Sequence, residues 1–145
     1  MTDSGNIIAD GDFLQTLIPQ KNPFVMVDTL NDYTEQYIVS NFTIPKDNIL
    51  VSKDHFSALG LIENMAQTVA LHTGYKYYLK KKPAPTGYIG AIKKAEIFQL
   101  PEVSKTLVTT VEILYDIMGV TLVQAKVECE GVTLASSEMK TALAQ

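Results

Sequence analysis

One long helical stretch constrains the fold of this chain more than any other feature: residues 54–82, DHFSALGLIENMAQTVALHTGYKYYLKKK. Apolar residues recur along it at the three- and four-residue spacing of one helix face. They are Leu59, Ile62, Ala66, Val69, Ala70 and Tyr77. Ser57 suits the N-cap, because its hydroxyl can accept a hydrogen bond from an unpaired backbone N–H of the first turn. Three lysines and then Pro83 follow, and both favour a helix end. We therefore expect a central helix over residues 57–82.

The chain before this helix predicts a short helix and a β-hairpin. Residues 1–10 have the character of a loose lead-in, and a helix of about two turns is expected after them, with Asp12 as its possible cap and Pro19 as its end. Residues 24–30 are apolar and β-prone, and residues 37–44 alternate in the manner of a half-buried strand. Asn31-Asp32 suits the turn between these two strands. Residues 45–54 predict a loop that leads into the central helix.

The chain after the helix predicts strands only. Alternating or β-prone residues are separated by short turn signals, of which Met118-Gly119 and Glu130-Gly131 are the clearest. The expected strands are residues 88–100, 106–117, 120–129 and 132–143. Strands at hairpin spacing favour antiparallel pairing, and a sheet and an apolar helix must bury each other. We therefore expect one α+β domain over residues 1–145, with a curved antiparallel sheet of about six strands wrapped around the central helix.

The composition excludes several classes of protein. Hydrophobic residues make up 46% of the 145 residues, which is enough for a core, but no apolar run is long enough to span a bilayer. The N-terminus has no basic region before an apolar one, so we expect no secretory signal. Cys129 is the only cysteine, as suits a reducing cytoplasm, and a net charge of −4 argues against binding nucleic acid. The sequence shows no metal constellation and no glycine-rich nucleotide loop, so we expect no cofactor.

Glu63 is the best candidate for a chemical group. It shares a helix face with Gln67, four residues later, and both stand among apolar residues. Glu63 could serve the positive end of its helix, or it could be a functional acid. Gln67 could orient Glu63 or bridge to a backbone group. His72 faces the other way, at about 100° per residue, and we expect a structural role for it.

Four stretches, in this order, together resemble the β-hydroxyacyl-acyl carrier protein dehydratases of the hotdog fold. They are LIPQKNPFVMVD at 17–28, DHF at 54–56, LIENMAQ at 61–67 and YIGAIKKAEI at 88–97. The first is similar to the family's opening motif, in which a His often stands at the place of Gln20. The second is similar to a Gly-His-Phe motif whose His is catalytic and falls on His55. The third is similar to the catalytic helix, whose acidic residue falls on Glu63. The fourth is similar to a strand whose glycine falls on Gly90.

The short connection between His55 and Glu63 makes the chain resemble one subgroup of these dehydratases more than the typical members. A typical dehydratase has a loop rich in Gly and Pro between the two, and here that loop is short and lacks its prolines. The chain therefore looks closer to a subgroup found in aryl polyene or flexirubin gene clusters, in which the catalytic His is not a constant feature. His55 is then either the catalytic base or a histidine of a surface loop.

The resemblance implies the dehydration of 3-hydroxyacyl thioesters to trans-2-enoyl thioesters, in fatty acid or polyene biosynthesis. His55 would be the base and Glu63 the acid, contributed to one substrate by different subunits across a two-fold interface. Donors for the developing enolate oxygen would come from the helix start near Ser57 and Gly60, or from Gly90. Gln67 would lie beside the substrate.

The resemblance also implies partners. The substrate would arrive on the phosphopantetheine arm of acyl carrier protein. Lysines at the helix end and on the next strand form either a docking patch for that acidic protein or a solvated face. They are Lys76, Lys80, Lys81, Lys82, Lys93 and Lys94. A homodimer, a higher homo-oligomer or a heteromer with a homologue is expected.

Two other functions fit the same residues. One is a hotdog acyl thioesterase, in which a carboxylate on this helix acts with water as the attacking group. The other is a non-catalytic acyl-binding subunit of a heteromeric dehydratase, for which an incomplete pair of His and acid is expected.

Overall fold

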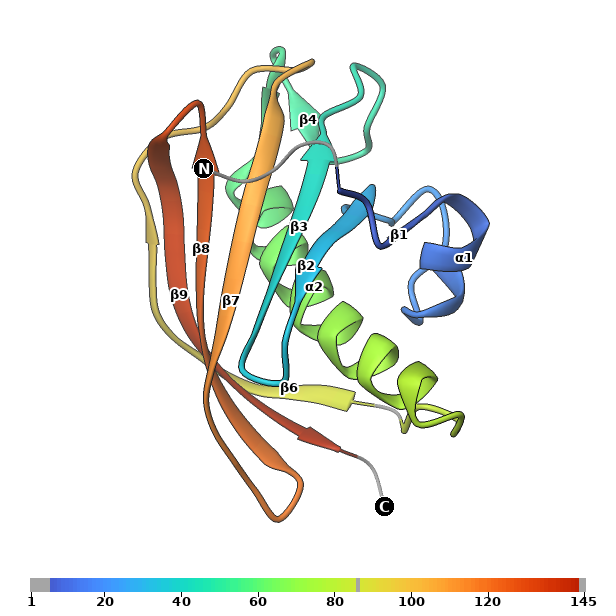
Figure 1. Cartoon of the computed structure of the whole chain (residues 1–145). Helices are drawn as coiled ribbons and strands as arrows, with labels where there is room; N and C mark the ends of the chain where they lie inside the picture. Colours follow the sequence, from blue (N-terminus) through green and yellow to red (C-terminus); the bar gives the residue numbers. More distant parts are fainter. Residues whose placement is uncertain (1–5, 86, 144–145) are drawn as a thin grey trace.

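The structure, a computed structural model, describes residues 6–85 and 87–143. The long helix α2 (Ala58–Leu79) lies along one face of a curved antiparallel sheet (Figure 1). Its start is the expected one, because Ser57 is the N-cap and its Oγ accepts a hydrogen bond from the Gly60 N–H at 3.2 Å. Its end comes three residues before residue 82, since Lys80 is the C-cap and Lys81 adopts a φ of 57°.

The sheet has seven described strands, all paired antiparallel with their neighbours, in the order β1-β2-β3-β7-β8-β9-β6. Their bounds are β1 Ala9–Asp10, β2 Thr29–Tyr33, β3 Tyr37–Thr43, β6 Gly87–Ile97, β7 Thr106–Ile117, β8 Val120–Cys129 and β9 Val132–Leu143. This is the expected class, an α+β fold with a sheet curved around one helix, with one short strand more than the six expected.

The last three strands have the bounds that the sequence predicts. Both of their turns are made by residues with positive φ: Met118 and Gly119 between β7 and β8, and Glu130 and Gly131 between β8 and β9. These turns set the register of the largest part of the sheet.

The N-terminal part differs from the expectation at its first hairpin, where β2 is Thr29–Tyr33 whereas a strand was expected over residues 24–30. Asn31-Asp32 is not the turn of the first hairpin but part of β2, and the chain reverses at residues 34–36, where Thr34 Oγ1 accepts hydrogen bonds from the N–H groups of Gln36 and Tyr37. Asn31 is buried and its side chain is bonded to Thr29 and to the carbonyl of Asn6, so its polar groups need no turn.

Three short strands were not predicted from the sequence, because two residues are too few to show a strand pattern. β1 lies within the expected lead-in, whose first five residues are outside the described part of the chain, and β4 (Val51–Ser52) and β5 (His55–Phe56) form a small hairpin in the expected loop. Helix α1 (Gly11–Thr16) is capped at Asp10, without a side-chain bond, so Asp12 is not its cap.

The predicted apolar residues of α2 supply only part of its core-facing surface: Val69 is buried, and Ile62, Ala66 and Ala70 are partly buried against the core. Leu61, Met65 and Leu71 are fully buried, whereas Leu59, on the expected face, is 58% exposed. The helix carries apolar residues on two sides, so the spacing alone does not select one. The side with Ala66 and Ala70 is only half-buried. No helix in the described part of the chain is both long enough and apolar enough to cross a bilayer.

Candidate active site

Glu63 projects from the first half of α2 and is half-buried. Its Oε2 accepts a hydrogen bond of 2.9 Å from Gln67 Nε2, one turn further along the helix. The carboxylate lines a cavity of about 560 Å³. Glu63 is therefore held by a neighbour at the wall of a cavity.

Three parts of the chain enclose this cavity. One wall is a single face of α2, because its lining residues recur every three or four positions. They are Glu63, Ala66, Val69, Ala70, Thr73 and Gly74. The second wall is residues 16–20, which are the last residue of α1 and the segment after it. The third wall is made by the paired ends of β6 and β9, with Ile89 and Leu143. Most of these side chains are apolar, as an acyl chain would require.

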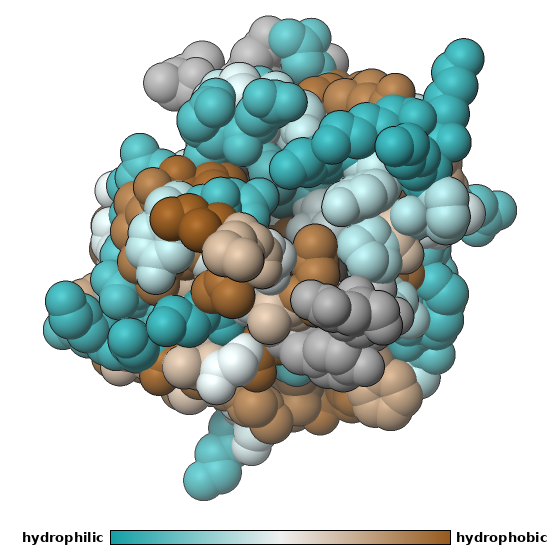
Figure 2. All heavy atoms as spheres, turned by 90° about the horizontal axis from the view of Figure 1, so that it is seen from below, coloured by the Kyte–Doolittle hydropathy of each residue, from teal (hydrophilic) through white to brown (hydrophobic). Residues whose placement is uncertain are grey.

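The cavity lies toward the end of the molecule where α2, β6 and β9 come together in Figure 1. Seen from that end, hydrophobic residues occupy much of the middle and of the lower edge of the face, and hydrophilic residues project mainly from its upper, left and right edges (Figure 2). Exposed apolar residues of this end include Leu79, Ile89 and Ile117.

Gln67 links the segment before β2 to helix α2 through hydrogen bonds. Its side chain is fully buried, its Oε1 accepts from the Met26 N–H at 2.6 Å, and its Nε2 donates to the Phe24 carbonyl at 2.8 Å as well as to Glu63. Both roles considered for it are present, since it orients Glu63 and bridges to the backbone. Its contact with a substrate stays a prediction.

Asn64 is a buried residue of the site region that the sequence reasoning did not single out. Its Nδ2 donates to the Met26 carbonyl at 2.8 Å, and its Oδ1 accepts from Thr109 Oγ1 of β7 at 2.5 Å. Asn64 thus links the helix to the sheet and to the same segment that Gln67 holds. The available signal was its place among the few polar residues of an apolar helix.

Ser57 and Gly60 form the helix start. The Gly60 N–H is used by the Ser57 cap, and a Cβ at position 60 would come within 2.5 Å of the Phe56 ring. The close approach of that ring accounts for the glycine. Neither residue lines the Glu63 cavity, and their binding of substrate stays a prediction.

Gly90 lies in β6 at an irregularity of the pairing with β9. Ile89 pairs with Thr141 and Ala91 with Lys140, so Gly90 is the extra residue of a bulge. Its neighbour Ile89 lines the Glu63 cavity, whereas Gly90 does not. A role for Gly90 as a donor remains a prediction.

His55 lies in β5 and is exposed. Its Nδ1 is 2.9 Å from the Lys53 carbonyl, and it lines a separate cavity of about 300 Å³ that also contains Cys129 and Glu130. The structure therefore does not bring His55 and Glu63 into one cavity within a single subunit.

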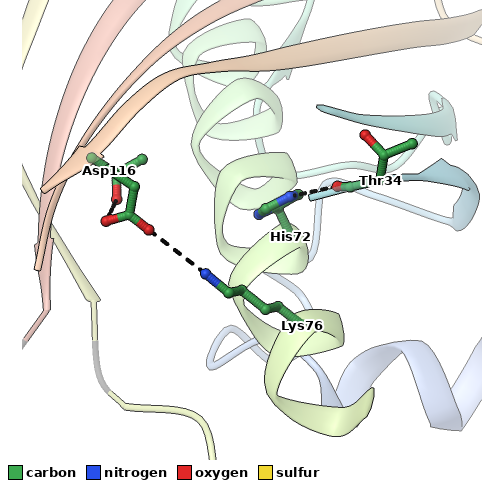
Figure 3. Close-up of polar contacts among 5 residues, drawn as sticks. Thr34, His72, Lys76 and Asp116 are labelled. Carbon is green, nitrogen blue, oxygen red and sulfur yellow. Dashed lines mark hydrogen bonds and ion pairs between the residues drawn. The ribbon is translucent and has the colours of Figure 1, made fainter. Parts of the chain in front are cut away.

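His72 makes structural contacts, in keeping with the role expected from its position on the helix. Its ring is buried, and Nε2 is 2.9 Å from the Thr34 carbonyl (Figure 3). Burial lowers the pKa of His72, and the nearby positive charge of Lys76 lowers that pKa further. The hydrogen bond to the Thr34 carbonyl acts in the opposite direction and raises it. Lys76 itself reaches Asp116 of β7, with Nζ and Oδ2 3.6 Å apart. Within residues 6–85 and 87–143, no three His, Cys, Asp or Glu side chains come together as metal ligands would.

Comparison with known proteins identifies relatives along nearly the whole chain. The ApeP-like family, described as ApeP dehydratase, matches residues 13–145. The 3-hydroxyacyl-acyl carrier protein dehydratase FabZ of Aliivibrio fischeri is 26% identical over 136 residues, which cover 89% of each protein. The FabZ of Vibrio cholerae is 24% identical over 139 residues, which cover 89% of this chain and 88% of that protein.

Solved structures agree with this fold. The dehydratase heterocomplex ApeI:P from Xenorhabdus doucetiae contains a chain with a TM-score of 0.84 and 15% identity, with 91% of each chain covered. A hypothetical thioesterase from Streptococcus pneumoniae, solved with coenzyme A, has a TM-score of 0.64 and 8% identity, with 79% of this chain and 84% of that chain covered. The fold is the hotdog fold, and the chain belongs to the ApeP-like family of dehydratases.

Proposed function

We propose that this protein removes water from 3-hydroxyacyl thioesters carried on acyl carrier protein, giving trans-2-enoyl thioesters. The observation that carries this proposal is the half-buried carboxyl of Glu63 at the wall of an elongated, largely apolar cavity. The lining residues of α2 extend from Glu63 to Gly74, about 16 Å at 1.5 Å per residue. An acyl chain lying along this face would keep its reacting end near Glu63. Membership of the ApeP-like family and the distant similarity to FabZ support the same reaction.

Glu63 would act as the acid of the elimination. A base removes a proton from Cα, the Cβ–O bond breaks, and Glu63 gives its proton to the departing hydroxyl, which leaves as water. Among the described residues, Gln67 is the side chain that hydrogen-bonds the carboxylate, and it does so at Oε2. Oε1 is then the oxygen available to the substrate.

The base would come from a second subunit. His55 and Glu63 line different cavities of one chain, so one subunit alone does not offer both groups to a substrate. A second copy would contribute its own His55, and a homologous partner would contribute an equivalent group. The similar chain in a dehydratase heterocomplex supports a paired arrangement for this protein.

An acidic carrier would dock on the lysines beside the cavity. Lys80, Lys81 and Lys82 at the end of α2 are exposed, and so are Lys93 and Lys94 on β6. Lys76 is tied to Asp116 and contributes less free charge to such a patch. Complementary charge of this kind mainly accelerates and orients encounter.

A thioesterase is the second candidate, and one observation favours it. Glu63 has no histidine beside it within its cavity, and one carboxylate that activates water is enough for hydrolysis. The products separate the candidates. Wild-type protein, alone and with a homologous partner, is incubated with a 3-hydroxyacyl carrier, and the products are identified by mass spectrometry.

An enoyl product supports the dehydratase, free acid supports the thioesterase, and neither product supports a non-catalytic subunit. The trans-subunit arrangement is tested by mixing. Glu63→Ala and His55→Ala are each expected to be inactive, and their mixture is expected to recover activity, because hybrid dimers contain one intact site. Exposed Glu96 of β6 provides the control Glu96→Ala. A fully active His55→Ala would exclude His55 as the base.

A further inference from the structure

A second, smaller cavity adjoins the Glu63 cavity. It has a volume of about 80 Å³ and is lined mainly by α2 and by strands β7, β8 and β9. Four residues line both cavities: Val69 and Thr73 of α2, and Thr141 and Leu143 of β9. We call these four residues the neck. Because the neck is a wall of both cavities, an occupant of the larger cavity that extends past it enters the smaller one.

The walls on the two sides of the neck differ in charge. Among the described residues that line the larger cavity, Glu63 is the one with an acidic or basic side chain. The smaller cavity is lined by two acids, a lysine and a histidine, which are Glu35, Asp116, Lys76 and His72. At the neck, therefore, a largely apolar cavity meets a charged one.

An ion pair joins the helix to the sheet at the smaller cavity. Lys76 Nζ of α2 and Asp116 Oδ2 of β7 are 3.6 Å apart (Figure 3), and Asp116 Oδ1 accepts a hydrogen bond of 3.2 Å from Thr121 Oγ1 of β8. The exposed fractions of the two charged side chains are 28% and 45%, so both charges are partly hydrated. An alkyl group that entered this cavity would displace water from the charges, which costs free energy. A bare hydrocarbon end is therefore an unfavourable occupant.

The distance from Glu63 to the neck is set by the helix. Val69 and Thr73 are six and ten residues after Glu63, which corresponds to about 9 and 15 Å along α2. An extended chain advances about 1.2 Å per bond, so roughly 7 to 12 bonds beyond Cβ reach the neck. An acyl chain of roughly 10 to 15 carbons would then fill the larger cavity.

We propose that the Lys76–Asp116 pair sets the upper limit on the length of the acyl chain, whose far end stops at the neck. This inference rests on the proposed function, since it places the chain along α2 with its reacting end at Glu63. Each methylene added short of the neck is buried against apolar side chains and increases the affinity. Each methylene added beyond the neck meets the hydrated ion pair and brings no increase. The pair acts on chain length and not on the chemical step.

The test is the affinity for unreactive ligands of increasing length. These are saturated acyl pantetheines with an amide in place of the thioester and with chains of roughly 8 to 18 carbons, on both sides of the expected limit. Calorimetry compares wild type with Lys76→Met/Asp116→Val, in which apolar side chains replace both charges so that neither is left unpaired. The control Lys126→Met/Glu128→Leu removes an ion pair that is also 3.6 Å long but lines neither cavity. Any partner subunit needed for activity is present throughout.

In wild type, we expect the affinity to rise about threefold per methylene up to the limit and then to reach a plateau. In Lys76→Met/Asp116→Val the rise should continue over about two more methylenes, so that the longest ligands bind about tenfold more tightly than they bind wild type. Ligands that end short of the neck should bind both proteins equally, and the control variant should keep the wild-type plateau. A plateau at the same length in wild type and Lys76→Met/Asp116→Val, or no plateau in wild type, would overturn the proposal.

Thr73→Leu tests the neck while keeping the ion pair, so it does not depend on the stability of the double variant. The larger side chain occupies the end of the cavity, and the plateau should therefore begin at a shorter chain than in wild type. An unchanged plateau would contradict the placement of the limit. Because the ligands do not react, the two proposals fail separately: a plateau that shifts as expected without any enoyl product refutes only the dehydration, and enoyl product with an unshifted plateau refutes only the role of the pair.

Discussion

Gly74→Ala tests how closely residues 16–20, which form one wall of the cavity, pack on α2. A Cβ at this position would stand 1.8 Å from the Leu17 carbonyl oxygen and 2.8 Å from the Leu17 carbonyl carbon. Because ordinary contacts are near 3.4 Å, the backbone of residues 16–20 would have to move by about 1.5 Å. Overpacking against backbone that cannot rotate away costs about 3 kcal/mol or more, and the better helix propensity of Ala returns about 1 kcal/mol.

We therefore expect Gly74→Ala to lose about 2–3 kcal/mol of unfolding free energy, which lowers Tm by roughly 5–10 °C in a domain of this size. Urea denaturation followed by circular dichroism measures the loss. Gly87→Ala is the matched control, since its Cβ would meet only Leu143 Cδ2 at 3.7 Å and the Ala142 oxygen at 4.0 Å. The reasoning is refuted if Gly74→Ala is as stable as wild type or more stable, as an unobstructed helical glycine would be.

Two further changes probe buried polar groups. Asn64→Leu should cost about 2–4 kcal/mol in urea denaturation, because Thr109 Oγ1 and the Met26 carbonyl lose their partner, and adding Thr109→Val should recover part of this cost. No recovery would contradict the pairing. His72 has a pKa lowered by burial, so the unfolded chain binds the proton first. Stability should fall as pH drops below about 6.5, and it should fall less steeply in His72→Gln than in wild type. Identical slopes for the two proteins would contradict this.

Local sequence patterns predicted the central helix and the last three strands. The central helix, its Ser57 cap and the bounds of β7, β8 and β9 follow from hydrophobic period and from turn residues that tolerate positive φ. The first hairpin did not follow, because Asn31-Asp32 has turn chemistry while its side chains are satisfied within a strand. Tertiary contacts decided that choice.

The same limit applies to the site. The pairing of Glu63 with Gln67 was visible from their spacing of four residues on one helix. The bonds of Gln67 to Met26, and of Asn64 to Thr109, join residues 41 and 45 positions apart, which no local pattern reveals.

The most direct measurement of the central claim is the effect of Glu63→Gln on catalysis and on binding together. If Glu63 gives its proton to the departing hydroxyl, kcat/KM for a 3-hydroxyacyl carrier should fall about 100-fold or more. The Tm should stay near that of wild type, and so should the affinity for an unreactive saturated acyl pantetheine with an amide in place of the thioester. The reason is that the substituted glutamine keeps the size of the Glu63 side chain. A variant that still produces the enoyl thioester at close to the wild-type rate would contradict the account.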